Sequence, residues 1–395
     1  MLNQSVLALG KKRSTIREIF EYGNLRAAQV GRENIFDFSI GNPNVPAPDA
    51  VRRAILDIAQ GDPCAVHGYT SAQGAPQARQ AITDNLNARF GTQYTAEQLY
   101  LTVGAAASIS ICFKALTASP EDEFIIFAPF FPEYTVFIEQ GAGAKCVIVP
   151  AQDADFQIDF DAFEARLTAH TKGVVINSPN NPSGVVYSDQ TVARLAEILT
   201  RKSEEYGHPI YLISDEPYRE IVYDGRETPF VAKAYPRTLV CYSYSKSLSL
   251  PGERIGYVLV PQVEEFGDLY AAVCGAGRVL GYVCAPSLFQ QVAARCAGET
   301  ADLSVYEENR RLLFEGLTQM GYSCVKPDGA FYLFPRTLEA DDRAFCERAK
   351  KYDLLLVPGT DFGAPGHMRI SYCVQTETIR RALPLFRRLA EEYGR

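Results

Sequence analysis

Residues 243–256 read Ser243-Tyr244-Ser245-Lys246-Ser247-Leu248-Ser249-Leu250-Pro251-Gly252-Glu253-Arg254-Ile255-Gly256, and they follow an apolar run, 239–242, that predicts a buried strand. Serine hydroxyls and a guanidinium suit a phosphate group, and a lysine amine beside them can act as a nucleophile. Such a set would hold a phosphorylated aldehyde and bond to it as an imine, which is the chemistry of pyridoxal 5'-phosphate (PLP). A polar turn with a solvated lysine and arginine is the alternative, and the rest of the sequence has to decide.

The length and composition of the chain predict a globular protein of two domains. It has 395 residues, of which 47% are hydrophobic and 22% charged. The net charge of −8 argues against nucleic acid or an anionic membrane as the main partner. No apolar run reaches membrane-spanning length, and residues 1–13 lack the apolar core of a signal peptide. We therefore expect a cytoplasmic protein with no nucleic-acid or membrane partner.

The ten cysteines and four histidines show no pattern of disulfides or metal ligands. The cysteines form no Cys-x-x-Cys pair, and several lie inside apolar runs. The histidines, at positions 67, 170, 208 and 367, are too scattered for a metal motif. We expect reduced thiols, as in the cytoplasm, and no metal site.

Apolar runs alternate with helical patterns from residue 98 to residue 273. The predicted strands are 98–103, 123–128, 145–149, 173–177, 210–214, 239–243 and 255–260, and the predicted helices are 105–118, 132–141, 159–168, 189–206 and 263–273. This alternation predicts an α/β fold in which a mainly parallel seven-stranded sheet lies between helices. Ligands of such sheets bind beyond the carboxyl ends of the strands.

The pattern changes after about residue 300. Short strands are predicted at 322–325, 331–334, 354–357 and 368–373, between helices at 303–317, 341–351 and 376–392. We therefore predict a large domain over residues 46–300 and a smaller α+β domain built from residues 1–45 and 301–395.

Polar or glycine-rich segments follow several predicted strands. Residues 102–108, Thr-Val-Gly-Ala-Ala-Ala-Ser, open a helix whose free amides could bind phosphate, although a plain turn explains this segment better when it is taken alone. Residues 128–134 carry aromatic side chains that could stack on a flat ring or simply fill the core. Residues 177–184 contain three asparagines and two prolines, and this rigid turn would present the amide of Asn181 at the sheet edge.

Two further segments carry charge. Asp215 ends a buried strand and needs a cationic or hydrogen-bonding partner, such as a protonated pyridine nitrogen, and Tyr218 could bond the phenolic oxygen of that ring. Arg369 lies in an apolar strand and needs an anion, either a structural carboxylate, which the segment alone favours, or that of a substrate. The order of all these segments along the chain is the strongest evidence.

The sequence resembles the class I/II aminotransferases, which are PLP enzymes of fold type I. The resemblance rests on Asn-Asn-Pro-Ser-Gly (180–184), Ser-Asp-Glu-x-Tyr (214–218) and Ser-x-Ser-Lys-x-x-x-x-Pro-Gly-x-Arg-x-Gly (243–256), and it extends from residue 41 to residue 372. Within this class the chain looks most similar to the bacterial aspartate and aromatic aminotransferases.

The resemblance implies a role for each matching residue. Lys246 would join the cofactor and shuttle the proton, Asp215 would keep the ring nitrogen protonated, and Tyr218 would bond the ring oxygen. The implied cofactor-binding residues are Gly104, Ala105, Ala106, Phe131, Asn181, Asp215, Tyr218, Ser243, Ser245, Lys246, Arg254 and, from a neighbouring subunit, Tyr69. The implied substrate-binding residues are Gly41, Asn181, Tyr332, Arg369 and Arg278. A solvated arginine at a helix end is the alternative for Arg278.

We therefore expect a transaminase that moves an amino group between an L-amino acid, aspartate or aromatic, and a 2-oxo acid such as 2-oxoglutarate. Shared active sites imply a homodimer. Some aspartate-specific relatives have a lysine in the turn after the position of Gly104, where this chain has Ala105-Ala106-Ala107. The alternatives are a PLP-dependent C–S β-lyase and a non-catalytic PLP-binding regulator. A Rossmann dehydrogenase is disfavoured because no Gly-x-Gly-x-x-Gly follows an early strand.

Overall fold

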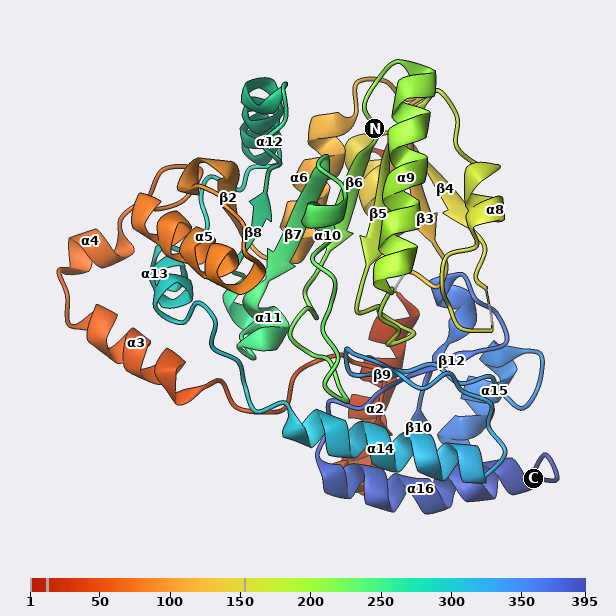
Figure 1. Ribbon diagram of the computed structural model, residues 1–395. Helices are drawn as coiled ribbons and strands as arrows, with labels where there is room; N and C mark the ends of the chain where they lie inside the picture. The colour runs from red at the N-terminus through yellow and green to blue at the C-terminus, as the bar shows by residue number, and fades with distance from the viewer. Residues whose placement is uncertain (1, 12–13, 153) are drawn as a thin grey trace.

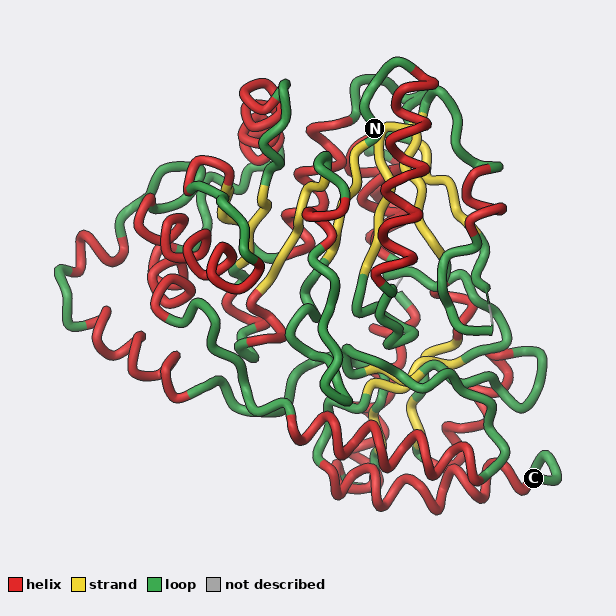
Figure 2. Tube along the Cα trace, viewed as in Figure 1, coloured by secondary structure: helices red, strands yellow, loops and turns green. Residues whose placement is uncertain are grey.

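A seven-stranded sheet forms the centre of the computed structural model, which describes residues 2–11, 14–152 and 154–395 (Figure 1; Figure 2). The strand order is β2 (Leu99–Thr102), β8 (Gly256–Leu259), β7 (Thr238–Ser243), β6 (Tyr211–Asp215), β5 (Thr171–Asn177), β3 (Glu123–Phe127) and β4 (Lys145–Val149). Strand β8 runs antiparallel to both of its neighbours, and the other adjacent pairs are parallel. The predicted mainly parallel seven-stranded sheet is therefore confirmed.

The central strands are apolar throughout because helices cover both faces of the sheet. In β3, Phe124 and Ile126 pack in one core, whereas Ile125 and Phe127 pack in another. The first core includes α6 (Ala105–Leu116), α7 (Glu133–Val136), η3 (Phe137–Ala142) and α12 (Phe266–Val279), and the second includes α8 (Phe160–Glu164), α9 (Asp189–Tyr206) and α10 (Val231–Ala234). A third core packs α3 (Asp49–Ala59), α4 (Pro63–His67), α5 (Pro76–Phe90) and α13 (Ser287–Arg295) against β2, β7 and β8.

A smaller layer lies below the carboxyl ends of the parallel strands, where α14 (Ser304–Gln319) and α16 (Thr376–Glu391) run across the bottom of Figure 1. It contains an antiparallel sheet of β11 (Val357–Pro358), β12 (Met368–Ser371) and β9 (Tyr332–Leu333), together with α15 (Asp342–Ala349). The N-terminal segment joins this layer, because β1 (Phe36–Asp37) pairs in parallel with β10 (Leu354–Leu355). The arrow of β7 points down into α11 (Tyr244–Ser247), at the junction of the two layers (Figure 1).

Two predicted elements differ from the structure. The predicted strand 322–325 is not formed: Ser323 O accepts a 2.8 Å bond from the Arg336 amide, but no strand ladder extends from it, and Pro327, which cannot donate, follows. The predicted helix 132–141 is formed over residues 133–142, but its second part, η3, is π-helical.

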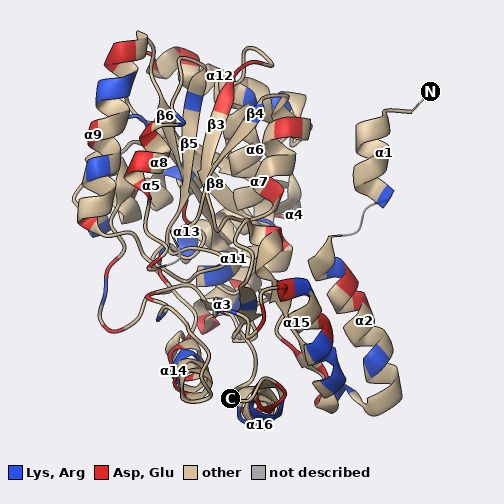
Figure 3. Ribbon diagram, turned by 90° about the vertical axis from the view of Figure 1, so that its right-hand side faces the viewer, with Lys and Arg blue, Asp and Glu red and all other residues tan. Residues whose placement is uncertain are grey.

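The N-terminal helices α1 (Gln4–Lys11) and α2 (Thr15–Val30) lie at one side of the molecule (Figure 3). Helix α1 stands away from the body there, and none of its residues is buried. Across residues 2–11, 14–152 and 154–395, no helix combines the length and the apolar character that crossing a bilayer requires.

Candidate active site

Lys246 lies in α11, the single helical turn that follows β7. Its Nζ donates a 2.7 Å hydrogen bond to the carbonyl oxygen of Gly41 and lies 5.4 Å from the ring centre of Phe331. Burial lowers the pKa of the Lys246 amine to about 8, and the charges of Arg369 and Arg254 act in the same direction. Near this pH a large fraction of the amine is neutral, which is the form that attacks an aldehyde.

Asp215 ends β6 and is buried, so its carboxylate depends on protein partners. Its Oδ2 accepts a 2.5 Å bond from the Tyr134 hydroxyl, whereas no described residue bonds Oδ1. Asn177 Nδ2 donates to the backbone oxygen of Asp215 at 2.9 Å and fixes the end of the strand. Burial raises the pKa of Asp215 to about 7, although the bond from Tyr134 opposes this rise. A protonated ring nitrogen would supply the donor that Oδ1 lacks.

The hydroxyls of Tyr218 and Tyr332 meet beside Gly41. Their oxygens lie 2.8 Å apart, and both side chains are buried. A side chain at Gly41 would collide with the Tyr332 hydroxyl, so glycine is required for this approach. Burial raises the pKa of Tyr218 well above its usual value and that of Tyr332 to about 12. Both hydroxyls therefore remain protonated at neutral pH and can donate hydrogen bonds.

Arg369 projects from β12 into the same region and is 3% exposed. Its Nη1 donates to Asn181 Oδ1 at 3.1 Å and its Nη2 to the Ser39 carbonyl oxygen at 2.5 Å, while Nε has no partner among the described residues. The guanidinium also contacts the rings of Tyr332 and Phe362 at 4.8 and 4.9 Å. Burial lowers the pKa of Arg369. Both of these acceptors are neutral, so this buried cation is matched to the carboxylate of a ligand.

An anion cradle forms where α6 begins. Gly104 precedes α6 at φ +93°, and a Cβ atom there would lie 2.8 Å from Nη2 of Arg254. Only glycine therefore leaves space between the arginine and the first turn of the helix. Within the described residues, no acceptor bonds the amides of Ala105 and Ala106. Free amides at a helix N-terminus beside a guanidinium fit a phosphate group.

Ser243 and Ser245 lie at the end of β7, close to this cradle. Their hydroxyl oxygens are 2.6 Å apart, and Ser243 Oγ also lies 3.4 Å from the carbonyl oxygen of Ile255, the residue after Arg254. Both serines are buried. Each hydroxyl can rotate to donate to a phosphate oxygen.

Three predicted residues lie at the edge of this cluster or outside it. Phe131 is partly buried and packs edge-on against Tyr134, with ring centres 5.6 Å apart, so it reaches the Asp215 region. Tyr69 is 91% exposed. Arg278, in the last turn of α12, is also exposed, and its side chain has no hydrogen bond or ion pair with any described residue. In a single chain, Tyr69 and Arg278 are therefore surface residues.

Sequence reasoning missed several site residues. Tyr134 lies in the first turn of α7. The signal that the sequence offered for it was its place in the aromatic segment 128–134, three residues after Phe131. Asn177 opens the segment 177–184, and its Oδ1 accepts a 2.7 Å bond from the Asn181 amide, which ties that residue to Asp215. No sequence motif marks Phe362 or the carbonyl group of Ser39.

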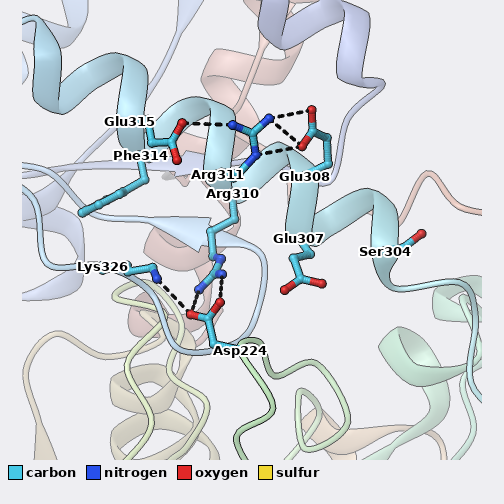
Figure 4. A pocket seen from close by; sticks show the side chains of 9 residues that line it. All are labelled: Asp224, Ser304, Glu307, Glu308, Arg310, Arg311, Phe314, Glu315 and Lys326. Atoms are coloured by element: carbon cyan, nitrogen blue, oxygen red, sulfur yellow. Dashed lines mark hydrogen bonds and ion pairs between the residues drawn. The ribbon is translucent and has the colours of Figure 1, made fainter.

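A separate pocket of about 430 Å³ lies along α14 (Figure 4). It is lined by Asp224, Ser304, Glu307, Glu308, Arg310, Arg311, Phe314, Glu315 and Lys326. Arg310 donates to both carboxylate oxygens of Asp224 at 2.8 and 3.0 Å, and Lys326 donates to the same carboxylate at 2.9 Å. Figure 4 shows these cations directed at carboxylates of the protein itself, so we interpret the pocket as a structural contact between α14 and the loop at Asp224.

The main cluster therefore combines four chemical capacities in one region. It has an amine that is partly neutral near pH 8, a buried carboxylate with a free oxygen, a phosphate-sized cradle and a buried guanidinium without an anion. The first three fit PLP, whose aldehyde, ring nitrogen and phosphate need these partners. The fourth fits a second ligand that carries a carboxylate.

Comparison with known proteins agrees with this chemistry. Residues 33–385 match the family profile "Aminotransferase class I and II". The aspartate/prephenate aminotransferase of Thermus thermophilus is 29% identical over 93% of this chain and 94% of its own length. The structure of an amino transferase from Eubacterium rectale is 59% identical, with a TM-score of 0.98 and full coverage of both chains. That of the Thermus thermophilus aspartate aminotransferase with maleate is 28% identical, with a TM-score of 0.85 over 98% of this chain and 99% of that chain.

The chain belongs to the class I and II aminotransferases. It is therefore an amino-acid aminotransferase of fold type I, and its cofactor is PLP. The predictions of fold, family, enzyme class and cofactor are confirmed.

Proposed function

We propose that Lys246, Asp215 and Tyr218 carry the reaction. When bound, PLP supplies an aldehyde that reacts with amines and a ring that accepts an electron pair. Lys246 Nζ would hold the cofactor through this aldehyde in the resting enzyme. Once the substrate amine has displaced it, the lysine amine would move the proton from the substrate α-carbon to the cofactor carbon. Asp215 keeps the ring nitrogen protonated, and Tyr218 and Asn181 donate hydrogen bonds to the ring oxygen. Asp215 Oδ1, buried and without a described partner, is the observation that carries this assignment.

Residues from three segments of the chain, 102–108, 128–134 and 243–256, would hold the cofactor. Gly104, Arg254 and the amides of Ala105 and Ala106 surround the phosphate, and the hydroxyls of Ser243 and Ser245 complete its hydrogen bonds. Phe131 would stack on the ring. Each charged hydrogen bond to the phosphate contributes about 1.5–3 kcal/mol, so several of them retain the cofactor while its bond to the lysine is open.

The substrate α-carboxylate binds Arg369, with help from Asn181, Tyr332 and the backbone at Gly41. Two contacts support this placement. Arg369 bonds the carbonyl oxygen of Ser39, and Lys246 bonds that of Gly41, so the guanidinium and the amine are held by the same short segment. An α-amino acid carries its carboxylate and its amino group one carbon apart, which matches this arrangement.

We propose aspartate or an aromatic L-amino acid as the donor and a 2-oxo acid such as 2-oxoglutarate as the acceptor. The names of the relatives support this choice. The turn at Ala105 offers no cation for a distal carboxylate, so we assign that task to Arg278, which would reach the site of the partner subunit. A donor without a distal carboxylate would not need it.

Initial rates with aspartate, tyrosine and alanine test the donor, with 2-oxoglutarate as the acceptor. Glutamate is tested with oxaloacetate as the acceptor, because glutamate and 2-oxoglutarate would only exchange with each other. The proposal predicts that aspartate or tyrosine is the best donor. It also predicts that Arg278→Ala slows the half-reaction of aspartate and leaves that of tyrosine unchanged. Each half-reaction is followed by the change in cofactor absorbance with the donor alone, because 2-oxoglutarate itself carries a distal carboxylate. Alanine as the best donor would contradict the proposal. Release of pyruvate and ammonia without an acceptor would identify a β-lyase instead.

We also propose a homodimer with shared active sites, in which Tyr69 reaches the phosphate of the partner subunit. Its 91% exposure in the single chain supports this role. Subunit mixing tests it: a hybrid of one Lys246→Ala chain and one Tyr69→Phe chain has one site with both native residues. Mixing should therefore raise the activity above that of either variant alone. Additive activities in a hybrid verified by native mass spectrometry would contradict the sharing of sites.

Two further proposals concern organisation and location. We propose that residues 46–300 form the large domain and that residues 1–45 and 301–395 form the small one, supported by the pairing of β1 with β10. We place the protein in the cytoplasm, because all ten cysteines are free and a reducing compartment keeps them so.

A further inference from the structure

A hydrogen-bonded network adjoins the candidate site, and none of its residues is assigned to the binding of cofactor or substrate. Its centre is Arg219, which is 3% exposed. Arg219 Nε donates a 2.6 Å bond to Glu216 Oε2, and Nη1 donates a 3.1 Å bond to the Tyr257 hydroxyl. The other carboxylate oxygen of Glu216 accepts a 2.7 Å bond from Ser214 Oγ. The buried charge pair is therefore compensated by hydrogen bonds as well as by its own attraction.

Tyr242 extends the network toward α11. Its ring stacks on that of Tyr257, with centres 5.0 Å apart and planes at 24°, and lies 4.5 Å from the guanidinium carbon of Arg219. The Tyr242 hydroxyl is hydrogen-bonded to Glu220 Oε2 at 2.9 Å and to Ser247 Oγ at 2.8 Å. These contacts connect the Glu216–Arg219 pair with the helical turn that carries Lys246. We call this set of six residues the Arg219–Tyr242 network: Glu216, Arg219, Glu220, Tyr242, Ser247 and Tyr257.

Three members of the network are direct chain neighbours of the three residues that we assign to the reaction: Glu216 follows Asp215, Arg219 follows Tyr218, and Ser247 follows Lys246. Contacts that hold one residue restrict where the next residue can lie, since the peptide unit between them is planar. The network is thus attached to the loop that carries the acid and the tyrosine and to the turn that carries the amine.

The turn at Lys246 depends on such contacts. Helix α11 has four residues, and a helix this short is not stable by itself. Ser247 is held on two sides: its hydroxyl bonds Tyr242, and its carbonyl oxygen accepts a 2.7 Å bond from the Ala301 amide. The position of the amine next to Ser247 therefore depends on these two bonds.

Four members of the network, Arg219, Glu220, Tyr242 and Tyr257, line a pocket of about 520 Å³ whose lining includes none of the assigned site residues. Tyr244 lines the same pocket, and its hydroxyl has no hydrogen bond to another described residue. These four members thus border a space separate from the one that the assigned site residues surround.

We propose that the Arg219–Tyr242 network positions Asp215, Tyr218 and Lys246 relative to one another, and that the Tyr242–Ser247 hydrogen bond is its link to Lys246. This inference rests on the proposed roles of those three residues. The network members are positioning residues, because they touch neither the cofactor nor the substrate.

The test compares Tyr242→Phe, which removes the linking hydroxyl, with Tyr244→Phe, which removes a hydroxyl of the same pocket that lies outside the network. We expect Tyr242→Phe to lower kcat about 5- to 10-fold while KM stays within about twofold. It should also shift, by about 0.3 pH units or more, the midpoint of the pH titration of the visible absorbance of the bound cofactor. Tyr244→Phe should change neither quantity. The thermal midpoints of the two apoproteins should agree, which separates positioning from a general loss of stability.

Ser247→Ala removes the other partner of the same bond and completes a double-mutant cycle. If the bond is the link, the Tyr242→Phe/Ser247→Ala protein is no more impaired than either single variant. Additive losses, or equal behaviour of Tyr242→Phe and Tyr244→Phe, would overturn the inference while leaving the proposed function intact. A Lys246→Ala protein with unchanged visible absorbance and full turnover would refute the proposed role of Lys246, and the inference with it.

Discussion

Replacement of Arg369 by lysine tests the placement of the substrate α-carboxylate. Arginine has five donors in a planar fork, of which one bonds Asn181 and one bonds the Ser39 carbonyl, and Nε is among those that remain for a carboxylate. Lysine keeps the charge but cannot form two parallel hydrogen bonds. The loss of one charged hydrogen bond costs about 1.5–3 kcal/mol, which corresponds to a decrease of about 10- to 150-fold in kcat/KM.

The assay measures kcat/KM separately for the amino acid and for the 2-oxo acid. Both substrates carry an α-carboxylate, so Arg369→Lys must impair both by the same factor. The affinity of the apoprotein for PLP should stay within about twofold, because Arg369 is not part of the phosphate cradle. Arg310→Lys is the matched control, since it makes the same change at a buried arginine near Asp224, outside the site. A decrease of less than threefold, or one confined to one substrate, would refute the placement.

Three further predictions follow from Lys246, from the cradle and from the pocket of Figure 4. With a pKa of about 8, Lys246 in the apoprotein is about half neutral at pH 8, against about 0.4% for an ordinary lysine. Its labelling rate by an amine reagent should therefore be half-maximal near pH 8 and level off above about pH 9, and a rate that still rises steeply up to pH 10 would contradict the lowered pKa. Gly104→Ala should weaken PLP binding by about 10- to 100-fold in an equilibrium titration of the apoprotein, because its Cβ displaces Arg254, and an unchanged Kd would count against the cradle. Arg310 and Lys326 hold the pKa of Asp224 below its usual value, so this carboxylate stabilises the fold above pH about 4 and stabilises it less as the pH falls. Because the Asp224 side chain is 44% exposed, Asp224→Asn should lower the free energy of unfolding by only about 1 kcal/mol at pH 7. In urea titrations this difference should shrink below pH 4, and a difference that does not depend on pH would contradict the ion pair.

The sheet could be predicted from the sequence because its strands are short apolar runs between polar turns. Strands such as β5 are apolar on both faces, and this pattern is typical of a sheet covered on both sides. The smaller layer was harder to predict, because β9, β10 and β11 have two residues each, which is too short to show the alternation of a strand. The predicted strand at 322–325 is not formed there, because an apolar segment can enter a core without joining a neighbouring strand in a ladder.

The site residues that follow strands could be predicted because parallel strands end at the same edge. Lys246, Asp215 and Asn181 all belong to such segments. Their partners come from elsewhere: Tyr134 from α7, and the carbonyl oxygen of Ser39 from the N-terminal segment. Carbonyl groups and packing partners leave no mark on residue type, so only the three-dimensional structure identifies them.

The same reason hides the Arg219–Tyr242 network from sequence analysis. Arg219 next to Tyr218 looks like a solvated charge in a turn, yet it is buried. Its partner Tyr257 lies 38 positions further along the chain, in the antiparallel strand β8. The fold brings the two together because β8 lies beside β7, an order that no local pattern indicates.

The most direct test of the central assignment is to identify the lysine that holds the cofactor. Borohydride reduction of the purified holoenzyme, followed by trypsin digestion and mass spectrometry, attaches the cofactor permanently to the amine that bears it. The account predicts a single modified lysine, Lys246, in the peptide that spans residues 238–254, and no modified peptide from the Lys246→Ala protein. Modification of a different lysine in the wild-type enzyme, or an equal yield of modified peptide from the variant, would contradict it.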